Sequence, residues 1–239
     1  MIKKIFCFKS IILFSTILIV SCSKESNNNE IWDPLEPINR QVFSINMLLD
    51  TYALKPLSLG YNYITPNIVK TSINNHINWS KTPSSIVNSS LQLKTNQTFS
   101  ELFVFSINAL SFGFYELIEN DGISYETFDD TLAHYNIPTG PYLVIPLLGP
   151  STSRGISSQS INYFINPSNL IDDENFSNYN IKISPLDILD NRSRYMDDID
   201  NLKNNSFDPY SKFRSIYFQQ LKKNSNNNFQ QDSFFNEYE

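Results

Sequence analysis

The sequence contains few of the residues on which most catalytic and metal-binding sites depend. Its 239 residues include two cysteines, two histidines and six glycines, and both cysteines, Cys7 and Cys22, lie close to the amino terminus. Two thiols at one end of a chain cannot form a disulfide framework or a cysteine-ligated zinc site. There is also no glycine-rich phosphate loop, no G-x-S-x-G elbow and no H-E-x-x-H pair. These absences argue against the common nucleotide-binding, serine-hydrolase and metalloprotease classes.

Positive charge is scarce as well. Lysine and arginine together number 18 against 24 acidic residues, which gives a formal net charge of −6. Proteins that bind nucleic acid or anionic lipid headgroups through bulk charge need a basic surface. The composition therefore predicts no nucleic-acid partner.

The first 22 residues have the layout of a bacterial secretory signal. Lys3 and Lys4 precede an apolar stretch, Ile11–Val20, that is too short to span a bilayer. Its end, Ile19-Val-Ser-Cys22, resembles a lipobox, in which the cysteine receives a diacylglycerol, the preceding peptide bond is cut and the new amine is acylated. We therefore predict removal of residues 1–21 and a lipid anchor on Cys22. An ordinary secretory signal and an uncut N-terminal anchor helix are the alternatives.

An acylated Cys22 would hold the mature chain on a membrane, since three acyl chains bind far more strongly than one. Ser23 follows the cysteine, which resembles the sorting signal of enterobacterial lipoproteins that pass to the outer membrane. The mature chain would keep no free thiol. Its formal net charge would change from −6 to −9, because residues 1–21 contain three lysines and no acidic residue.

Composition divides the mature chain into three parts. Residues 22–30 form a polar tether, and residues 223–239 form an Asn- and Gln-rich tail that we predict to be disordered. The intervening residues 31–222 suffice for one domain with a sizeable core.

The spacing of apolar residues in this domain is mostly helical. One apolar stripe is expected on Pro37–Asp50, where apolar side chains recur at intervals of four, three and four. We expect Pro56 to end the segment that follows, and Pro83 to separate two helices. The members of the stripe are Ile38, Val42, Ile45 and Leu49.

Thr98–Phe112 is apolar on nearly all sides, as is typical of a helix at the centre of a large core or against lipid. It is too short to cross a bilayer.

The last helix is predicted to begin at Asp208-Pro209, with an acidic start and a basic end that suit the helix dipole. Further helices are expected at Pro66–Trp79, Ser84–Leu93 and Ser184–Leu202, and the last helix places Tyr210, Phe213, Tyr217 and Leu221 on one face.

One apolar segment, GPYLVIPLLGPS at residues 140–151, is neither a long helix nor a central strand, because Pro146 interrupts it. We expect short extended pieces at Tyr142–Ile145 and Leu147–Leu148. A turn would then lead into a helix capped by Ser151 or Thr152. No alternating strand series appears elsewhere, so the predicted fold class is mainly α with one short hairpin-like extended segment.

An acidic cluster near the middle of the chain is the best candidate for catalysis. With an acid, a histidine and a hydroxyl, it could in principle form a lipid hydrolase. Solvated loop carboxylates and a packed or capping histidine explain the same residues, and no catalytic spacing supports an enzyme. We therefore predict no enzymatic activity, no metal and no cofactor. The residues concerned are Glu126, Asp129, Asp130 and His134, with Ser151 or Ser153 as the nucleophile.

Several blocks in one order resemble the MlaA (VacJ) family of outer-membrane lipoproteins, over about residues 31–222. Each block alone is a weak signal, but together, behind a lipobox, they are specific. The blocks are Asp33-Pro-Leu-Glu-Pro-Ile-Asn-Arg40 with Val42-Phe43, Asn46 and Asp50; Lys55-Pro56, Gly60-Tyr61 and Pro66; Phe128, Thr131-Leu132 and His134-Tyr135; Gly140-Pro-Tyr142, Pro146, Gly149-Pro-Ser151 and Arg154; and Leu186 to Arg192, Arg194, Asp208-Pro-Tyr210, Arg214 and Tyr217-Phe-Gln219.

The sequence also departs from the family pattern. Asp129-Asp130 stand where the family usually has Gly-Gln, and Arg154-Gly155 where it usually has Arg-Asp. Asn136 and Pro138 stand where glycines are common. These changes are expected to affect local turn geometry and the closure of this loop, and not the helix-forming blocks.

The resemblance implies a single ring-like domain of amphipathic helices lying in the inner leaflet of the outer membrane. It implies a non-catalytic role, in which misplaced outer-leaflet phospholipids pass through an amphipathic channel. The implied partners are a trimeric outer-membrane porin and a soluble periplasmic lipid carrier like MlaC. An envelope lipid hydrolase and a purely structural envelope lipoprotein are the alternative functions.

Polar and aromatic positions that match the family motifs could line such a channel. For Asn39 and Arg40, helix capping and an ion pair with Glu36 explain the same residues equally well. The candidate channel or motif positions are Asn39, Arg40, Phe43, Asn46, His134, Tyr142 and Arg154.

Overall fold

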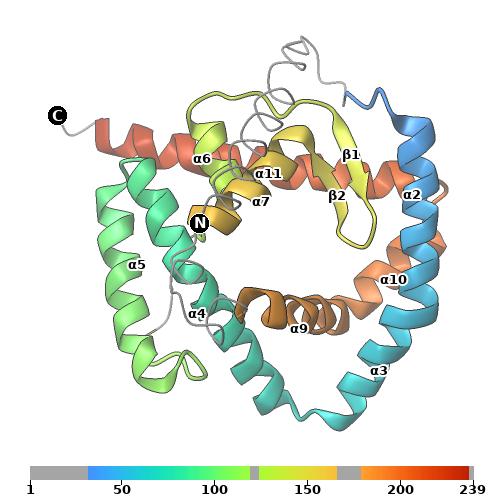
Figure 1. Cartoon of the computed structure of the whole chain (residues 1–239), viewed down its shortest axis with the longest axis horizontal. Coiled ribbons are helices and arrows are strands. Elements are labelled where there is room, and N and C mark those ends of the chain that lie inside the picture. Colours follow the sequence, from blue (N-terminus) through green and yellow to red (C-terminus); the bar gives the residue numbers. More distant parts are fainter. Residues whose placement is uncertain (1–31, 119–123, 166–178, 237–239) are drawn as a thin grey trace, which may run out of the picture.

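The computed structural model describes the backbone of residues 32–118, 124–165 and 179–236 (Figure 1). It leaves the side chains of residues 163–165, 179–184 and 225–236 undescribed. The predicted signal peptide, lipid anchor and tether lie outside the described residues. In chain order the elements are α2 (Glu36–Leu49), the π-helical turn η1 (Asp50–Leu54), α3 (Lys55–Ile64), α4 (Asn67–Leu91), α5 (Thr95–Asn108), the 3-10 turn η2 (Ala109–Ser111), α6 (Phe128–His134), β1 (Tyr142–Ile145), β2 (Gly149–Thr152), α7 (Ser153–Ile165), α9 (Tyr179–Arg194), α10 (Met196–Asn205) and α11 (Pro209–Asn236).

The helices are arranged as a ring (Figure 1). Helices α2, α3, α4 and α5 form its outer arc, and α9 lies inside the corner between α3 and α4. The β1–β2 hairpin, α6 and α7 complete the ring, with α11 crossing behind them. The predicted fold class, mainly α with a short hairpin, is confirmed.

Two proline predictions were wrong. Pro56 does not end a helix but lies in the first turn of α3, directly after the π-helical turn η1. Pro83 lies inside the single long helix α4 instead of separating two helices. An internal proline removes one helical hydrogen bond, and packing of α4 against α5, α6, α7 and α9 outweighs this loss.

The carboxyl-terminal third also differs from the predicted helices. The segment predicted as one helix over Ser184–Leu202 forms two helices, because the helix breaks at Tyr195 before α10. The first of them, α9, also begins earlier than predicted, at Tyr179. Helix α11 begins at Pro209 as predicted, but it continues to Asn236 through most of the tail predicted to be disordered. Neither glycine nor proline follows Pro209 to end the helix.

The apolar segment at residues 140–151 forms a two-stranded antiparallel hairpin, in which Tyr142 pairs with Thr152 and Ile145 with Gly149. The second strand is therefore Gly149–Thr152 and not Leu147–Leu148, which lie in the turn. Thr152 caps α7 as one of the two predicted alternatives, because its hydroxyl accepts the Gly155 N–H at 3.1 Å.

The apolar core is small and aromatic. Tyr142 and Val144 of β1, Phe43 of α2 and Tyr210 of α11 are buried against one another. The Phe43 and Tyr210 rings meet edge to face, with centroids 5.6 Å apart. This core fixes the hairpin between α2 and α11, and the predicted α11 face contributes to it through Phe213 and Tyr217.

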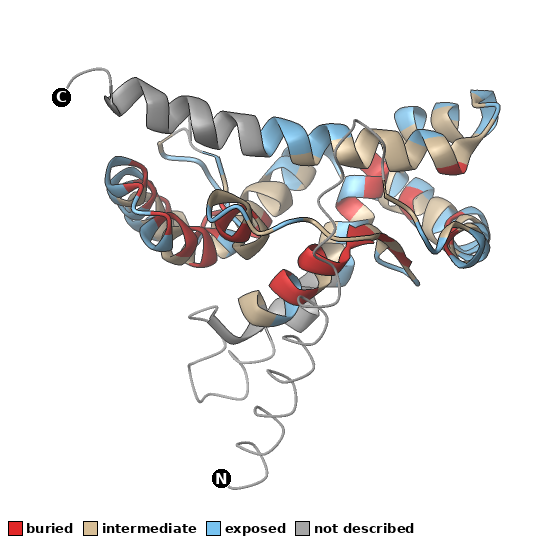
Figure 2. Ribbon diagram, turned by 90° about the horizontal axis from the view of Figure 1, so that it is seen from above, coloured by how far each residue is buried: buried red, intermediate tan, exposed pale blue. Residues whose placement is uncertain are grey.

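Outside this core, the usual distribution of polar and apolar side chains is inverted. On α2, Ile38 and Ile45 of the predicted stripe are exposed, whereas Asn39 is buried. On α5, Phe99 and Phe103 are exposed, whereas Glu101 is buried. Helix α5 therefore has a polar inner face that the prediction of an all-round apolar helix missed. Figure 2 shows the exposed residues on the outward sides of the helices and the buried ones towards the middle.

No helix in the described part of the chain combines the length and the apolar character needed to cross a membrane.

Candidate functional site

Exposed apolar side chains along the helices of the outer arc form a surface that we call the apolar rim. Its side chains are between 40% and 94% exposed. The surface of a water-soluble protein has scattered exposed apolar residues, but rarely so many on neighbouring elements. Such a surface requires an apolar partner, either lipid or another protein. The apolar rim consists of Ile38, Ile45, Leu48, Leu49 and Tyr52 near α2, Leu57, Leu59, Tyr63, Ile64, Ile68 and Val69 around the α3–α4 corner, and Phe99, Leu102, Phe103 and Leu110 near α5.

Behind the rim, α4 and α5 meet through a buried carboxylate. Glu101 is 1% exposed and accepts hydrogen bonds from Ser85 at 2.9 Å and Ser89 at 3.0 Å. Gln97 donates to the same carboxylate at 2.9 Å. Burial raises the pKa of Glu101, although these three hydrogen bonds act in the opposite direction.

A second buried carboxylate joins α4 to the segment before α6. Glu126 forms an ion pair with Lys94 at 2.9 Å, and both side chains are at most 5% exposed. Gln92 donates to Glu126 at 3.1 Å and to the Thr131 hydroxyl at 3.0 Å. Paired charges of this kind can be buried, whereas an isolated charge cannot. The interior between α4, α5 and α6 is thus polar, and both of its carboxylates are hydrogen-bonded, although the side-chain oxygens of Gln92 and Gln97 have no hydrogen-bond partner.

The Glu101→Gln variant is expected to be more thermostable than the wild type at pH 7.5. A carboxyl whose pKa is raised by folding loses stability as the pH rises from the ordinary glutamate value through the raised value. Glutamine carries no charge, its oxygen can accept from Ser85, and its amide can donate to Ser89. We expect a rise in melting temperature of about 3 °C that vanishes at pH 4. Thermal unfolding in detergent measures it, with exposed Glu116→Gln as the control, and an equal gain at both pH values would contradict the explanation.

Two asparagines of α2 hold the free edge of β1. Asn39, which is 2% exposed, donates to the Tyr142 carbonyl at 3.0 Å and accepts the Val144 N–H at 2.9 Å. Asn46 repeats this pattern two helical turns later, with the Ile145 carbonyl and the Leu147 N–H, both at 2.9 Å. An unpaired strand edge is a liability, and these amides satisfy it in place of a third strand. We call this arrangement the asparagine clasp.

Charged residues join the start of the domain to α11. Arg40 pairs with Glu36 at 2.8 Å, as one of the predicted alternatives had it, and with Asp208 at 2.7 Å. Arg214 pairs with Asp33 at 2.6 Å. Both guanidinium groups also lie against the Tyr210 ring, at 4.4 and 5.4 Å from its centroid. Asn39 does not cap α2, since the helix has no side-chain cap.

Arg154 lies near the start of α7 and is 6% exposed. It makes a two-pronged contact with Asp129, at 2.8 and 3.1 Å, and donates to the Ile137 carbonyl at 2.7 Å. His134, in the last turn of α6, is half-buried beside the Tyr135 ring. Arg154 thus ties α7 to α6 and to the loop between them.

The structure thus divides the seven candidate positions into two groups. Asn39, Arg40, Phe43, Asn46 and Tyr142 gather where α2 meets the hairpin and α11, whereas His134 and Arg154 lie on α6 and α7. Tyr142 is fully buried, and burial raises its pKa. The lining of a channel by any of the seven residues stays a prediction.

The acids of the hydrolase hypothesis have structural partners. Glu126 pairs with Lys94 and Asp129 with Arg154. Asp130 accepts the Thr127 N–H at 2.9 Å in a capping box at the start of α6. In the described residues, no group of three or more His, Cys, Asp or Glu could hold a metal ion.

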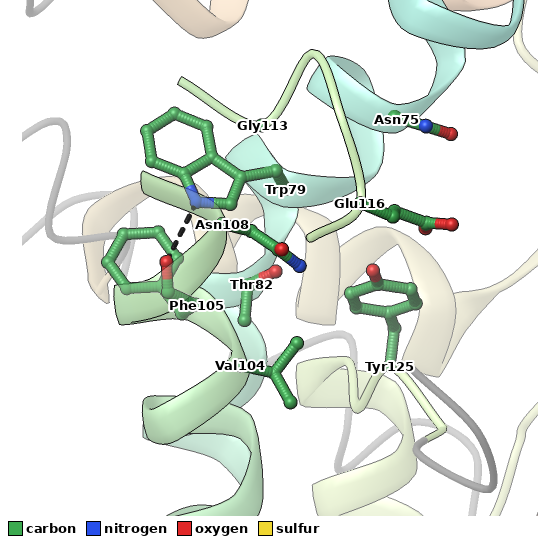
Figure 3. A pocket seen from close by; sticks show the side chains of 9 residues that line it. All are labelled: Asn75, Trp79, Thr82, Val104, Phe105, Asn108, Gly113, Glu116 and Tyr125. Atoms are coloured by element: carbon green, nitrogen blue, oxygen red, sulfur yellow. Dashed lines mark hydrogen bonds between the residues drawn. The ribbon is translucent and has the colours of Figure 1, made fainter. Parts of the chain in front are cut away.

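A pocket between α4 and α5 is too small for a lipid. Trp79 donates its indole N–H to the Phe105 carbonyl at 3.1 Å and forms one wall, with Glu116 and Tyr125 opposite (Figure 3). The open volume is about 10 Å³, that of one water site. It offers no site for a substrate or cofactor.

Comparison with known sequences identifies the family. The sequence model of the family described as MlaA lipoprotein matches residues 31–224. The chain belongs to this family. The predicted resemblance is therefore confirmed.

Relatives agree with this assignment. The Escherichia coli protein named intermembrane phospholipid transport system lipoprotein MlaA is 25% identical over 222 residues, which cover 88% of this chain and 85% of the relative. An uncharacterized protein of Rickettsia prowazekii is 34% identical over 191 residues, or 78% of this chain and 75% of the relative. The chain is also similar to a solved structure, described as the structural basis for maintenance of bacterial outer membrane lipid asymmetry, with a TM-score of 0.69 and 27% sequence identity. The match covers 81% of this chain and 98% of the chain in that structure.

The departures from the MlaA pattern have local explanations. Asp129 supplies the acidic partner of Arg154, and Asp130 completes the capping box. A side chain at Gly155 would place its Cβ 2.9 Å from the Ser151 hydroxyl, so an aspartate there would not fit without movement. Asn136 has a φ of 57° after the end of α6, a conformation that asparagine tolerates better than most residues.

Sequence reasoning missed several buried charges. Asp50 pairs with Arg192 at 2.6 Å and with Lys203 at 2.6 Å, across more than 140 residues. A signal for Glu101 was present, because it is the single charged residue in the apolar stretch Thr98–Phe112. A lone acid in such a stretch indicates a buried, hydrogen-bonded carboxylate.

Proposed function

We propose that the protein is the lipid-anchored outer-membrane component of an intermembrane phospholipid transport system. In this role, phospholipids misplaced in the outer leaflet pass through an amphipathic channel in the ring to a soluble periplasmic carrier like MlaC. Such transport maintains the lipid asymmetry of the outer membrane. A trimeric porin is the proposed neighbour in the membrane, and no step in this function requires catalysis by this chain.

The inverted distribution of side chains carries this proposal. A phospholipid has a charged headgroup and two apolar tails, so a protein that passes it through a membrane needs apolar surface outside and polar surface inside. The apolar rim provides the first and matches the surface of a protein embedded in lipid. The buried side chains around Glu101 and Glu126, between α4, α5 and α6, provide polar material behind the apolar rim without an unpaired charge.

The names of the relatives indicate which function to propose. The Escherichia coli protein is named for intermembrane phospholipid transport. The similar solved structure is described in terms of outer membrane lipid asymmetry. The asparagine clasp, with Phe43 and Tyr142, would position the hairpin at the edge of the proposed channel.

A strain lacking the gene is expected to accumulate phospholipid in the outer leaflet and to become sensitive to detergent and chelators. The wild-type gene should restore the asymmetry, and Cys22→Ala, which prevents acylation at the predicted anchor, should not. Phe99→Gln combined with Phe103→Gln makes the rim of α5 polar and should also fail.

The matched control is Ser100→Gln combined with Ser106→Gln, which changes exposed polar residues of the same helix and should complement fully. Surface phospholipid is measured by labelling intact cells, and membrane fractions report the amount of each variant. A deletion strain with normal surface lipid would refute the proposed function. Full complementation by the rim variant would refute the role of the rim.

A further inference from the structure

Helix α9 lies inside the corner of the ring and touches α3 and α4 along a polar seam (Figure 1). Three hydrogen bonds and one ion pair join α9 to these two helices, and we call these contacts the α9 seam. They are Tyr61 Oη to Asp190 Oδ1 at 3.0 Å, Asn62 Nδ2 to the Ser193 carbonyl at 3.4 Å, Arg194 Nη2 to the Lys70 carbonyl at 2.8 Å, and Lys81 Nζ to Asp187 Oδ2 at 2.8 Å.

The side chains buried at these helices are polar too. Among the side chains that the structure describes, α3 buries Ser58, and α9 buries Asp190, Arg192 and Ser193. The hairpin, by contrast, is held to α2 and α11 by buried aromatic rings. Apolar burial resists separation in water and polar contacts do not, because water or a charged headgroup can replace each hydrogen bond. Water or a headgroup can therefore replace the named contacts of the α9 seam as the helices part.

Two further features mark the seam as the place where the ring can change. The outer arc has a π-helical turn, η1, whose Asp50 pairs with Arg192 of α9, and the chain breaks at Tyr195 between α9 and α10. Irregular turns of this kind absorb changes of backbone angle that regular helix resists. The Ser193 hydroxyl is buried at the seam with no hydrogen-bond partner. The closed seam thus leaves one polar group unsatisfied, which an opened seam would hydrate.

We propose that α9 is a movable wall of the ring, which separates from α3 and α4 along the α9 seam when a phospholipid passes. The inference rests on the proposed function for its substrate, and the motion itself can be tested without it. In the opened state, the lysine and arginine groups of the seam would donate hydrogen bonds to the phosphodiester of the headgroup. The lipid tails would remain against the apolar parts of the ring.

Thiol labelling tests the motion directly, because the sequence has no cysteine after residue 22. Ser193→Cys places a thiol at a site that is 7% exposed and loses no side-chain hydrogen bond. Ser157→Cys is the matched control, a serine on α7 that is 3% exposed. In the full-length lipoprotein in membranes, a small membrane-permeant maleimide is expected to label position 193 at least tenfold faster than position 157. The wild type is the blank, and equal rates at the two positions would overturn the movable wall.

A cross-link tests whether transport needs the motion. Asn62→Cys combined with Ser193→Cys can be joined by a short bifunctional thiol reagent that reductant cleaves. The joined protein is expected to lose at least fivefold in phospholipid transport, and reduction should restore it. The two single variants, treated in the same way, should keep the wild-type rate.

The outcomes separate the two proposals. If the joined protein transports lipid as fast as the untreated one, lipid passage does not use the movable wall, that proposal is wrong, and the proposed function stands. If neither the wild type nor any variant transports phospholipid, the proposed function is wrong, and the labelling rates still decide whether α9 moves.

Discussion

Replacing Asn39 with leucine is expected to lower the free energy of unfolding by about 3 kcal/mol. Leucine has a similar size, but it can neither donate to the Tyr142 carbonyl nor accept the Val144 N–H. Both backbone groups would then be buried without a partner, and each such group costs about 1–3 kcal/mol. The Asp33 carboxylate would also lose a hydrogen bond of 2.8 Å. Urea unfolding of the purified protein in detergent measures the loss.

Two companion variants identify the cause of this loss. Asn46→Leu removes the same pattern of hydrogen bonds at a half-buried position near the turn, and we expect a cost of about 1 kcal/mol. Asn39→Asp keeps the acceptor for Val144 but loses the donor and adds charge beside Asp33. It should be nearly as unstable as Asn39→Leu at pH 7 and recover partly in acid, when the carboxyls are protonated. Equal stability of Asn39→Leu and the wild type would rule out the asparagine clasp as a source of stability.

Asp50→Asn is expected to destabilise the protein by about 3–5 kcal/mol at pH 7, the usual cost of breaking a buried ion pair. Asp50 accepts from Arg192, which is 3% exposed, and from Lys203. Without it, Asp200 would remain as the carboxylate paired with both Arg192 and Lys55. The buried Arg192 would then rely on a half-buried carboxylate that it already shares with Lys55, and Lys203 would lose its ion pair with Asp50.

The pH dependence of this variant follows from the pKa of Asp50. Burial opposes its ionisation, but hydrogen bonds from Arg192 and Lys203 outweigh burial and lower its pKa. A lowered pKa contributes stability above the ordinary aspartate value, which is lost as the pH falls through the lowered value. The wild type and Asp50→Asn should therefore converge in strong acid. The exposed Asp198→Asn should stay within about 0.5 kcal/mol of the wild type throughout, and a difference between Asp50→Asn and the wild type that does not depend on pH would refute the ion-pair explanation.

The sequence predicted best those features that depend on neighbours in the chain. The start of α11 at Asp208-Pro209, the strand Tyr142–Ile145 and the cap at Thr152 all follow from local rules, and all three are confirmed. A proline inside a helix is also a local signal, but it failed at Pro83. There, packing against four other elements outweighs one missing hydrogen bond.

The candidate positions illustrate the limit of motif reasoning. Asn39 and Asn46 were selected because they match a family motif, with a channel as their predicted role. The structure shows what they bind, the edge of β1, about 100 residues further along the chain. Spacing along α2 indicates that the two amides share a face of the helix, but it does not indicate which backbone lies opposite.

The sequence by itself determined the mainly helical class, the family and the helical periodicity, because local propensity and motif order depend only on residues that are close along the chain. Only the tertiary structure decided which side of each helix faces inwards. The apolar stripe of α2 would face the core of a water-soluble protein, yet here Ile38, Ile45 and Leu49 lie on the apolar rim and Asn39 lies inside. The pairing of Asp50 with Arg192 across 142 residues was decided in the same way. Burial depends on what the rest of the chain places opposite a side chain, and no local pattern contains that information.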